Sequence, residues 1–225
     1  MRVAKLAYAA TVLCSLTLFA SVKVEANIGS NSGKPPQQSM ESDQRKELFN
    51  TYSKVTGDVR IINALESLKG TGEFSRKAIL GDNLSGRPAK VYFYDLGNIN
   101  RSYSNYDALG MKKGKQLYIY VNQKHSNAPA EALAALLSHE ALHQDEYNSI
   151  NEETYAWTME ATVWHEMLQK HPDVRNNSTS CDLVNRENTL DKMLEVGNFS
   201  NRLIRNAVTT NPGYQGLPSR SPGFE

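Results

Sequence analysis

Cysteine is scarce in this sequence, and its scarcity restricts how the fold can be stabilised. The two cysteines are Cys14 and Cys181. Because Cys14 lies in an N-terminal apolar run that we expect to be removed, the mature chain would keep one cysteine and could form no internal disulfide. Residues 27–225 are numerous enough for a single domain with its own hydrophobic core.

An apolar run long enough to span a membrane comfortably is also missing. The run from Leu6 to Ala20 follows Arg2 and Lys5 and precedes a small-residue cleavage site that ends at Ala26. A membrane-spanning helix needs about 20 apolar residues, whereas this shorter layout is typical of a secretory signal peptide. We therefore predict a signal peptide over residues 1–26, a secreted or periplasmic location, and no stable membrane anchor after cleavage. An uncleaved anchor is the alternative.

Neither sign of charge is in excess. The formal net charge is +1 at pH 7, and a protein that binds nucleic acid or an anionic membrane surface usually carries a clear basic excess, so neither partner is predicted. Lysine and arginine are absent between Lys124 and Lys170. The charged residues of that interval are all carboxylates, and a divalent cation is their natural partner. They are Glu131, Glu140, Asp145, Glu146, Glu152, Glu153, Glu160 and Glu166.

Both ends of the expected mature chain have compositions that disfavour a packed core. Residues 27–43 are polar and rich in glycine, serine, proline and glutamine, and we predict a flexible leader there. Residues 209–225 contain three prolines and three glycines, which interrupt regular elements, and we predict a disordered or loosely draped tail. The folded domain is expected to span residues 44–208.

The pattern within this domain predicts helices and a small sheet. Residues 45–70 are expected to form one or two helices with a break near Gly57. Residues 89–96 and 116–122 are rich in aromatic and β-branched residues and are expected to be strands, with a turn just before the second. Successive side chains of the second strand would point to opposite faces of the sheet. One face would carry Leu117, Ile119 and Val121, and the other Tyr118 and Tyr120.

Helices dominate the second half of the domain. Pro129 suits the first turn of a helix that continues to about Glu146. Asn151 can cap a second helix that stops at Pro172, and a final helical segment spans roughly 181–207. This order of helix, strands and a run of helices predicts an α+β fold.

Two histidines lie four residues apart around a glutamate in the segment "SHEALHQ". On a helix, residues four apart share one face, so His139 and His143 can turn a ring nitrogen toward one point. In the H-E-x-x-H arrangement such a pair binds Zn²⁺, and the glutamate, here Glu140, handles the proton of the attacking water. The alternative is an ordinary amphipathic helix whose histidines are solvated or packed in the core.

A catalytic zinc site needs a third protein ligand. Ser149 stands six residues after His143, so the third histidine of the metzincin pattern is absent. The remaining candidates are Glu152, Glu153 and Glu160. If the two helices pack antiparallel about a turn near residue 148, the last two glutamates lie about equally far from the histidines, and the spacing alone does not choose between them.

The segment "HEALH", followed by a helix that opens "NEETYAW", resembles the gluzincin pattern of thermolysin, its relatives and anthrax lethal factor. The likeness covers about thirty residues and the strand before them. It implies a zincin-like peptidase with a glutamate ligand early in the second helix and a small residue three places on, which matches Glu153 and Ala156. It also implies an edge strand, here the one with Tyr118 and Tyr120, that pairs with an extended peptide or protein substrate.

The sequence departs from the gluzincin pattern at Trp157, where a polar residue often supports the ligands, so that support must come from elsewhere. Tyr147, Tyr155 and His165 are candidates for stabilising the oxyanion that forms when water attacks a carbonyl. A rival hypothesis is a secreted binding or structural protein that keeps the zincin framework but has no activity.

Overall fold

The computed structural model describes the backbone of residues 42–225 and the side chains of residues 45–176 and 181–225. The predicted signal peptide at residues 1–26 lies outside the described residues, as does the predicted leader at 27–43 except for its last two residues. Within the described part of the chain, no helix combines the length and the apolar character needed to cross a membrane.

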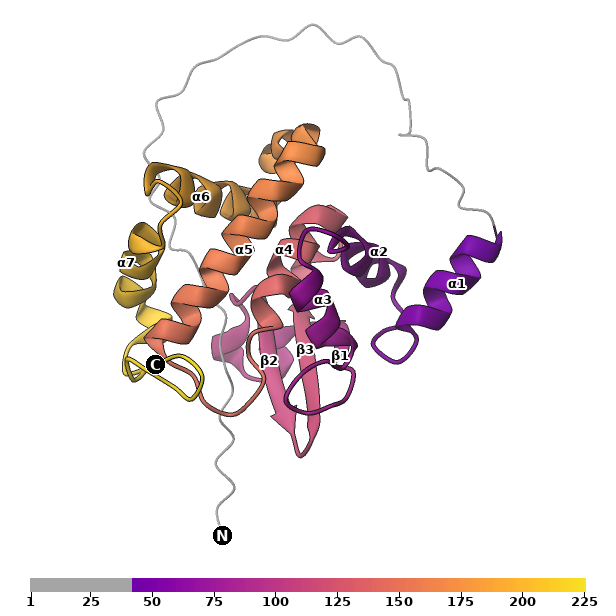
Figure 1. The fold of residues 1–225 in the computed structure, drawn as a ribbon, viewed down its shortest axis with the longest axis horizontal. Helices are drawn as coiled ribbons and strands as arrows, with labels where there is room; N and C mark the ends of the chain where they lie inside the picture. Colours follow the sequence, from indigo (N-terminus) through magenta and orange to yellow (C-terminus); the bar gives the residue numbers. More distant parts are fainter. Residues whose placement is uncertain (1–41) are drawn as a thin grey trace, which may run out of the picture.

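The described residues form seven α-helices and a three-stranded sheet, which confirms the predicted α+β class (Figure 1). The break between the first two helices contains Gly57, as predicted. The helices are α1 (Ser42–Tyr52), α2 (Val59–Ser67), α3 (Glu73–Leu80), α4 (Ala130–Glu140), α5 (Ile150–Lys170), α6 (Asp182–Val196) and α7 (Arg202–Thr210). The strands are β1 (Lys90–Tyr94), β2 (Ala108–Lys113) and β3 (Gln116–Asn122).

The central strand of the sheet is β3. The strand order is β1-β3-β2, with β1 parallel and β2 antiparallel to β3. β1 and β3 confirm the two predicted strands, but the sequence pattern does not predict β2, because Gly110 and the lysines at its end have low strand propensity. The prediction that residues 116–122 form an edge strand is therefore wrong, and β2 takes an edge position instead.

One face of the sheet packs against the helices. Leu117, Ile119 and Val121 of β3 belong to the main hydrophobic core together with residues of α2 and α4, as their alternation predicts. The helix α4 is central to this arrangement, because every residue from Ala132 to Glu140 is buried. Its last turn therefore presents side chains to the inside of the protein, where they can be held by neighbours on all sides.

The helix that carries the histidine motif is shorter than the sequence predicts. It ends at Glu140 instead of Glu146, and the chain then tightens into a turn in which the His143 N–H donates to the Glu140 carbonyl at 3.3 Å. The residues that follow, "QDE", are polar and have little apolar surface to bury against the core. Continuing the helix would therefore gain little from packing.

Two other helix predictions need correction. Ser149, and not Asn151, caps α5, with its hydroxyl accepting a hydrogen bond from the helix. The predicted segment 181–207 is divided into α6 and α7 at Asn198 and Phe199, whose backbones have left-handed φ angles of 55° and 57°. These angles end a right-handed helix, and no pattern of apolar residues signals them.

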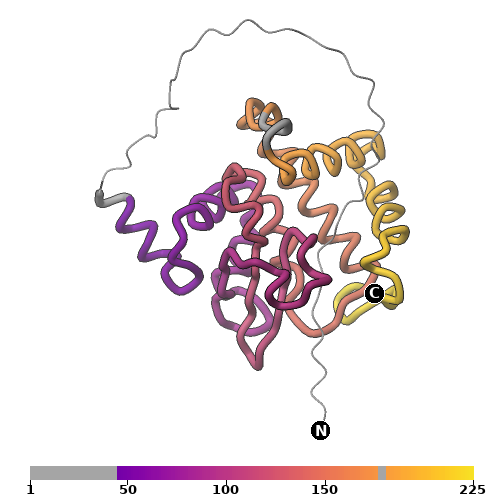
Figure 2. Tube along the Cα trace, turned by 180° about the vertical axis from the view of Figure 1, so that it is seen from behind, coloured from indigo at the N-terminus to yellow at the C-terminus, as the bar shows by residue number. Residues whose placement is uncertain are grey.

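For residues 209–225 the sequence predicts a disordered or loosely draped tail, and the structure shows a packed segment instead. The helix α7 extends to Thr210, and the residues that follow pack beside the connection leading into α5 (Figure 2). Tyr214 is only 2% exposed, and its hydroxyl accepts a hydrogen bond from Nε1 of Trp157 at 3.0 Å. Prolines and glycines interrupt helices but still allow an irregular segment to pack, so the folded domain includes residues 211–225.

Candidate metal centre

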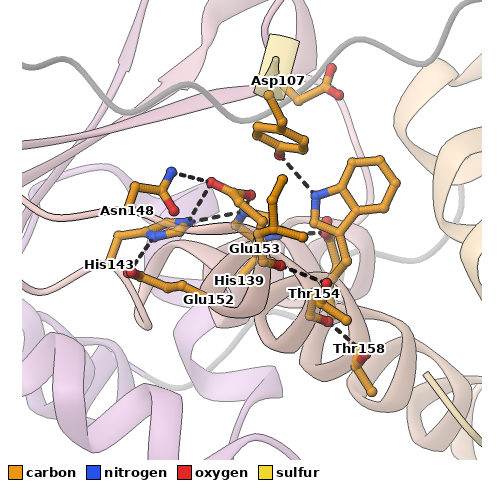
Figure 3. A network of polar contacts seen from close by, with 12 residues as sticks. Asp107, His139, His143, Asn148, Glu152, Glu153, Thr154 and Thr158 are labelled. Carbon is orange, nitrogen blue, oxygen red and sulfur yellow. Dashed lines mark hydrogen bonds and ion pairs between the residues drawn. The ribbon is translucent and has the colours of Figure 1, made fainter. Parts of the chain in front are cut away.

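Two histidine rings meet inside the protein at the end of α4 (Figure 3). His139 and His143 are 0% and 9% exposed, and their Nε2 atoms lie 3.3 Å apart. The tight turn after Glu140 keeps His143 on the same side as His139, although the helix has already ended. The structure thus brings together the two histidines that the motif predicts as ligands.

Glu153 of α5 completes a cluster of three possible metal ligands. Its Oε2 lies 3.7 Å from Nε2 of His139 and its Oε1 lies 3.7 Å from Nε2 of His143. The Asn148 amide donates to Oε1 at 2.5 Å, while Oε2 has no hydrogen-bond partner among the described residues. Ligand atoms around a tetrahedral zinc ion are roughly 3.4 Å apart. The residues present therefore fit a bound metal ion, since suitable atoms of all three lie within 4.8 Å of one another.

The other two candidate glutamates contact the opposite sides of the histidine rings. Oε1 of Glu152 lies 3.0 Å from Nδ1 of His143, and Oε2 of Glu160 lies 3.1 Å from Nδ1 of His139. A carboxylate at Nδ1 fixes the ring orientation and leaves Nε2 available for a metal. These two residues supply the support that Trp157 does not give, because the indole N–H of Trp157 bonds Tyr214 instead.

Glu140 lies beside the cluster with its carboxylate unsatisfied. The residue is 1% exposed, and neither carboxylate oxygen has a hydrogen-bond partner among the described residues. Burial raises the pKa of Glu140, and protonated His139 and His143 would oppose that rise. A carboxylate with a raised pKa is a better proton acceptor near neutral pH than an exposed one. The position and chemistry of Glu140 therefore suit a general base.

The charge state of His143 depends on the carboxylates around it. Burial alone would lower the pKa of His143, but the negative charges of Glu153 and Glu152 outweigh burial and raise the pKa to about 9. A pKa in this range favours the protonated ring at neutral pH. Because a histidine ligand must be neutral, binding of a metal ion to His143 would release a proton.

A buried ionic network extends from Glu160 to the sheet. Both guanidinium Nη atoms of Arg186, on α6, contact the Glu160 carboxylate, with Nη2 at 2.7 Å from Oε2. Nη1 of the same arginine lies 3.0 Å from Glu187, and Nε lies 3.4 Å from Asp107, just before β2. Asp107 also lies 2.6 Å from Nε2 of His125.

Sequence reasoning missed this network, although one signal was present. Arg186 and Glu187 occupy the face of α6 that carries the buried residues Leu183 and Leu190. Charged residues on an otherwise apolar helix face indicate a buried ionic contact, since such groups are seldom buried without partners.

None of the predicted oxyanion-stabilising residues is a buried part of the centre. Tyr147 and Tyr155 are 54% and 55% exposed. His165 lies twelve residues beyond Glu153 on α5, about 18 Å along the helix axis, and Nδ1 of its ring is paired with Asp191 at 2.7 Å. The prediction for His165 is therefore wrong, and neither tyrosine is held in place near the histidines by a hydrogen bond from the cluster.

The centre offers two imidazole nitrogens and a carboxylate from buried, hydrogen-bonded side chains. This donor set is used by catalytic zinc sites and also suits iron(II). Comparison of the chain with known proteins gave no match to a family model, to a curated protein or to a solved structure.

Proposed function

We propose that this protein is a zinc metallopeptidase of gluzincin type, with His139, His143 and Glu153 as zinc ligands and Glu140 as general base. One observation carries the proposal: both Nε2 atoms and the Glu153 carboxylate converge, while each Nδ1 atom has a carboxylate of its own. A histidine that is merely packed in a core does not need this arrangement on both of its nitrogens.

The chemistry divides between the ion and the protein. Zinc bound by these ligands would act as a Lewis acid and lower the pKa of a water molecule. Glu140 would take a proton from the attacking water and deliver it to the leaving amine. Glu152 and Glu160 would hold the two rings in the tautomer that binds metal.

The edge strand β2 is the proposed site for a peptide substrate. Among the described strands it pairs only with β3, and a Cβ atom on its Gly110 would lie 3.4 Å from Oε2 of Glu140. An extended peptide can add to such an edge by backbone hydrogen bonds, beside the proposed general base. Because the N-terminal pattern predicts export, we propose a peptide or protein substrate outside the cytoplasm.

The burial of the centre favours one rival function, a secreted zincin-like binding or structural protein without activity. His139, Glu140 and Glu153 are each at most 1% exposed, so a substrate could reach them only if neighbouring segments moved. The lack of an assigned residue to stabilise the oxyanion also favours the inactive protein.

A peptide-library digest combined with metal analysis distinguishes the two functions. We expect the wild-type protein to contain zinc and to cleave peptides, and the Glu140→Gln variant to keep zinc while turnover falls by about 10²-fold or more. Glu131→Gln, on the first turn of the same helix, is the matched control and should keep its activity. Zinc without cleavage in the wild type would support the inactive protein, and equal cleavage by Glu140→Gln would rule out the proposed base.

A further inference from the structure

The helix that carries Glu152 and Glu153 begins at a serine cap. The first N–H groups of an α-helix have no partner within the helix and must be satisfied by other groups. Ser149 satisfies one of them, because its hydroxyl accepts from the Glu152 N–H at 3.1 Å. Its carbonyl accepts the first regular helical hydrogen bond, from the Glu153 N–H at 2.9 Å.

The C-terminal segment, residues 211–225, satisfies two more of them. The Pro218 carbonyl accepts from the Ile150 N–H at 2.9 Å, and the Ser219 carbonyl accepts from the Asn151 N–H at 3.1 Å. The first turn of α5 is therefore completed by residues that lie almost seventy positions further along the chain. The same turn carries Glu152 and Glu153 of the candidate metal centre.

Ser221 extends this contact to the metal centre itself. Its side chain is buried, and its hydroxyl donates to Oε2 of Glu152 at 2.9 Å and lies 2.9 Å from the Ser149 hydroxyl. The other oxygen of Glu152 contacts Nδ1 of His143 at 3.0 Å. A continuous chain of contacts thus runs from Ser221 through Glu152 to His143.

We propose that Ser221 is a positioning residue of the metal centre, which holds Glu152 so that the carboxylate fixes the ring of His143. A carboxylate that is held at one oxygen only can rotate, and the ring that it contacts can rotate with it. The hydrogen bond from Ser221 holds the second oxygen of Glu152 and so prevents this rotation. The expected effect of Ser221 on metal affinity rests on the proposed zinc centre. The expected effect of Ser221 on the orientation of the His143 ring does not depend on zinc.

Zinc titration of three variants tests the effect on affinity. Ser221→Ala should weaken zinc binding by about three- to tenfold, less than the 10- to 100-fold typical of a residue that contacts a ligand directly. Ser221→Thr keeps the hydroxyl and should restore the affinity. Ser219→Ala is the control, because its side chain is exposed and its backbone carbonyl is unchanged. Equal zinc affinity in Ser221→Ala and wild type would contradict the proposal.

An NMR measurement on the metal-free protein tests the same proposal without zinc. The Nδ1–H proton of His143, which faces Glu152, should give a slowly exchanging signal in the wild type, in Ser219→Ala and in Ser221→Thr. That signal should broaden or disappear in Ser221→Ala. An unchanged signal in Ser221→Ala would overturn the role of Ser221, whether or not the protein binds zinc. A lost signal in a protein that binds no zinc would instead support Ser221 and refute the proposed function.

Discussion

Three glutamates of α5 contact the two histidines through different atoms. Glu152 and Glu153 are neighbours, so their side chains point about 100° apart around the helix and reach different rings or different nitrogens. Glu160 lies about two turns beyond Glu153 on nearly the same face and reaches the far nitrogen of His139. One helix therefore carries both the proposed ligand and the two carboxylates that contact the histidine rings at Nδ1.

Alanine variants of the three glutamates should separate these roles. Glu153→Ala removes a ligand and should cause the largest loss of zinc affinity. Glu152→Ala and Glu160→Ala should weaken binding by about 10- to 100-fold, as expected for residues that orient a ligand. Chelator competition measures the zinc affinity of all three variants, and the exposed Glu166→Ala is the control on the same helix. Loss of zinc in Glu160→Ala with zinc retained in Glu153→Ala would reverse the assignment.

The sequence predicts the residues of the centre better than their contacts. The spacing of His139 and His143 requires only one turn of helix, which the chain retains even though α4 ends early. The prediction of Glu153 as third ligand rests on the gluzincin resemblance and not on spacing, because the length and tilt of the connection through Asn148 decide which glutamate faces Nε2. Side-chain rotamers set the contacts of Glu152 and Glu160, and no sequence pattern gives them.

At the scale of elements, an ionic junction joins the start of β2 to α6 and to the short 3₁₀ helix Gln123–His125. Burial would raise the pKa of Asp107, but the hydrogen bond with His125 and the positive charges of Arg186 and Lys124 outweigh burial and lower the pKa to about 2. The Asp107 carboxylate therefore stabilises the folded state most while it is charged.

The Asp107→Asn variant should change how stability depends on pH. A carboxyl whose pKa is lowered by folding stabilises the protein above its unfolded pKa, and this contribution is lost as pH falls from about 4 to about 2. A shift from 3.8 to about 2 corresponds to about 2 kcal/mol. Denaturant unfolding across this range should show a shallower loss of stability in Asp107→Asn than in wild type. The exposed Asp173→Asn is the control, and parallel pH curves for Asp107→Asn and wild type would contradict the account.

Helices and strands are predicted well where the apolar residues are strongly periodic. The prediction fails where the conformation of one or two residues determines where an element begins or ends. β3 is predicted because its apolar residues alternate, whereas Gly110 interrupts the same pattern in β2. The break between α6 and α7 depends on the left-handed backbones of Asn198 and Phe199. Such conformations are chosen by tertiary contacts, which the sequence pattern does not show.

At the scale of the whole molecule, the candidate metal centre lies between α4, which belongs to the main hydrophobic core, and α5, which contributes residues to two cores. The main core packs the sheet against α2 and α4, and α5 also contributes residues to it. A second core joins α5 to α6, α7 and the C-terminal segment. Its members are Trp157, Ala161, Leu190, Leu194, Ile204, Val208 and Tyr214. The centre therefore depends on packing from both sides.

Tyr214→Phe tests whether the C-terminal segment belongs to the folded domain. The substitution keeps the ring but removes the acceptor for the buried indole N–H of Trp157, so the free energy of unfolding should fall by about 1–3 kcal/mol. The exposed Tyr155→Phe is the control, and denaturant unfolding is the measurement. If residues 211–225 were disordered, one of the two alternatives that their composition predicts, the two variants would unfold alike.

The central claim is that one zinc ion binds to each chain through His139, His143 and Glu153. Elemental analysis of the purified protein at neutral pH tests this claim most directly, together with a His139→Ala/His143→Ala double variant and an exposed His171→Ala control. We expect one zinc per chain in the wild type and in the control, and none in the double variant. Stoichiometric zinc in the double variant, or a wild-type protein that takes up no zinc, would contradict the account.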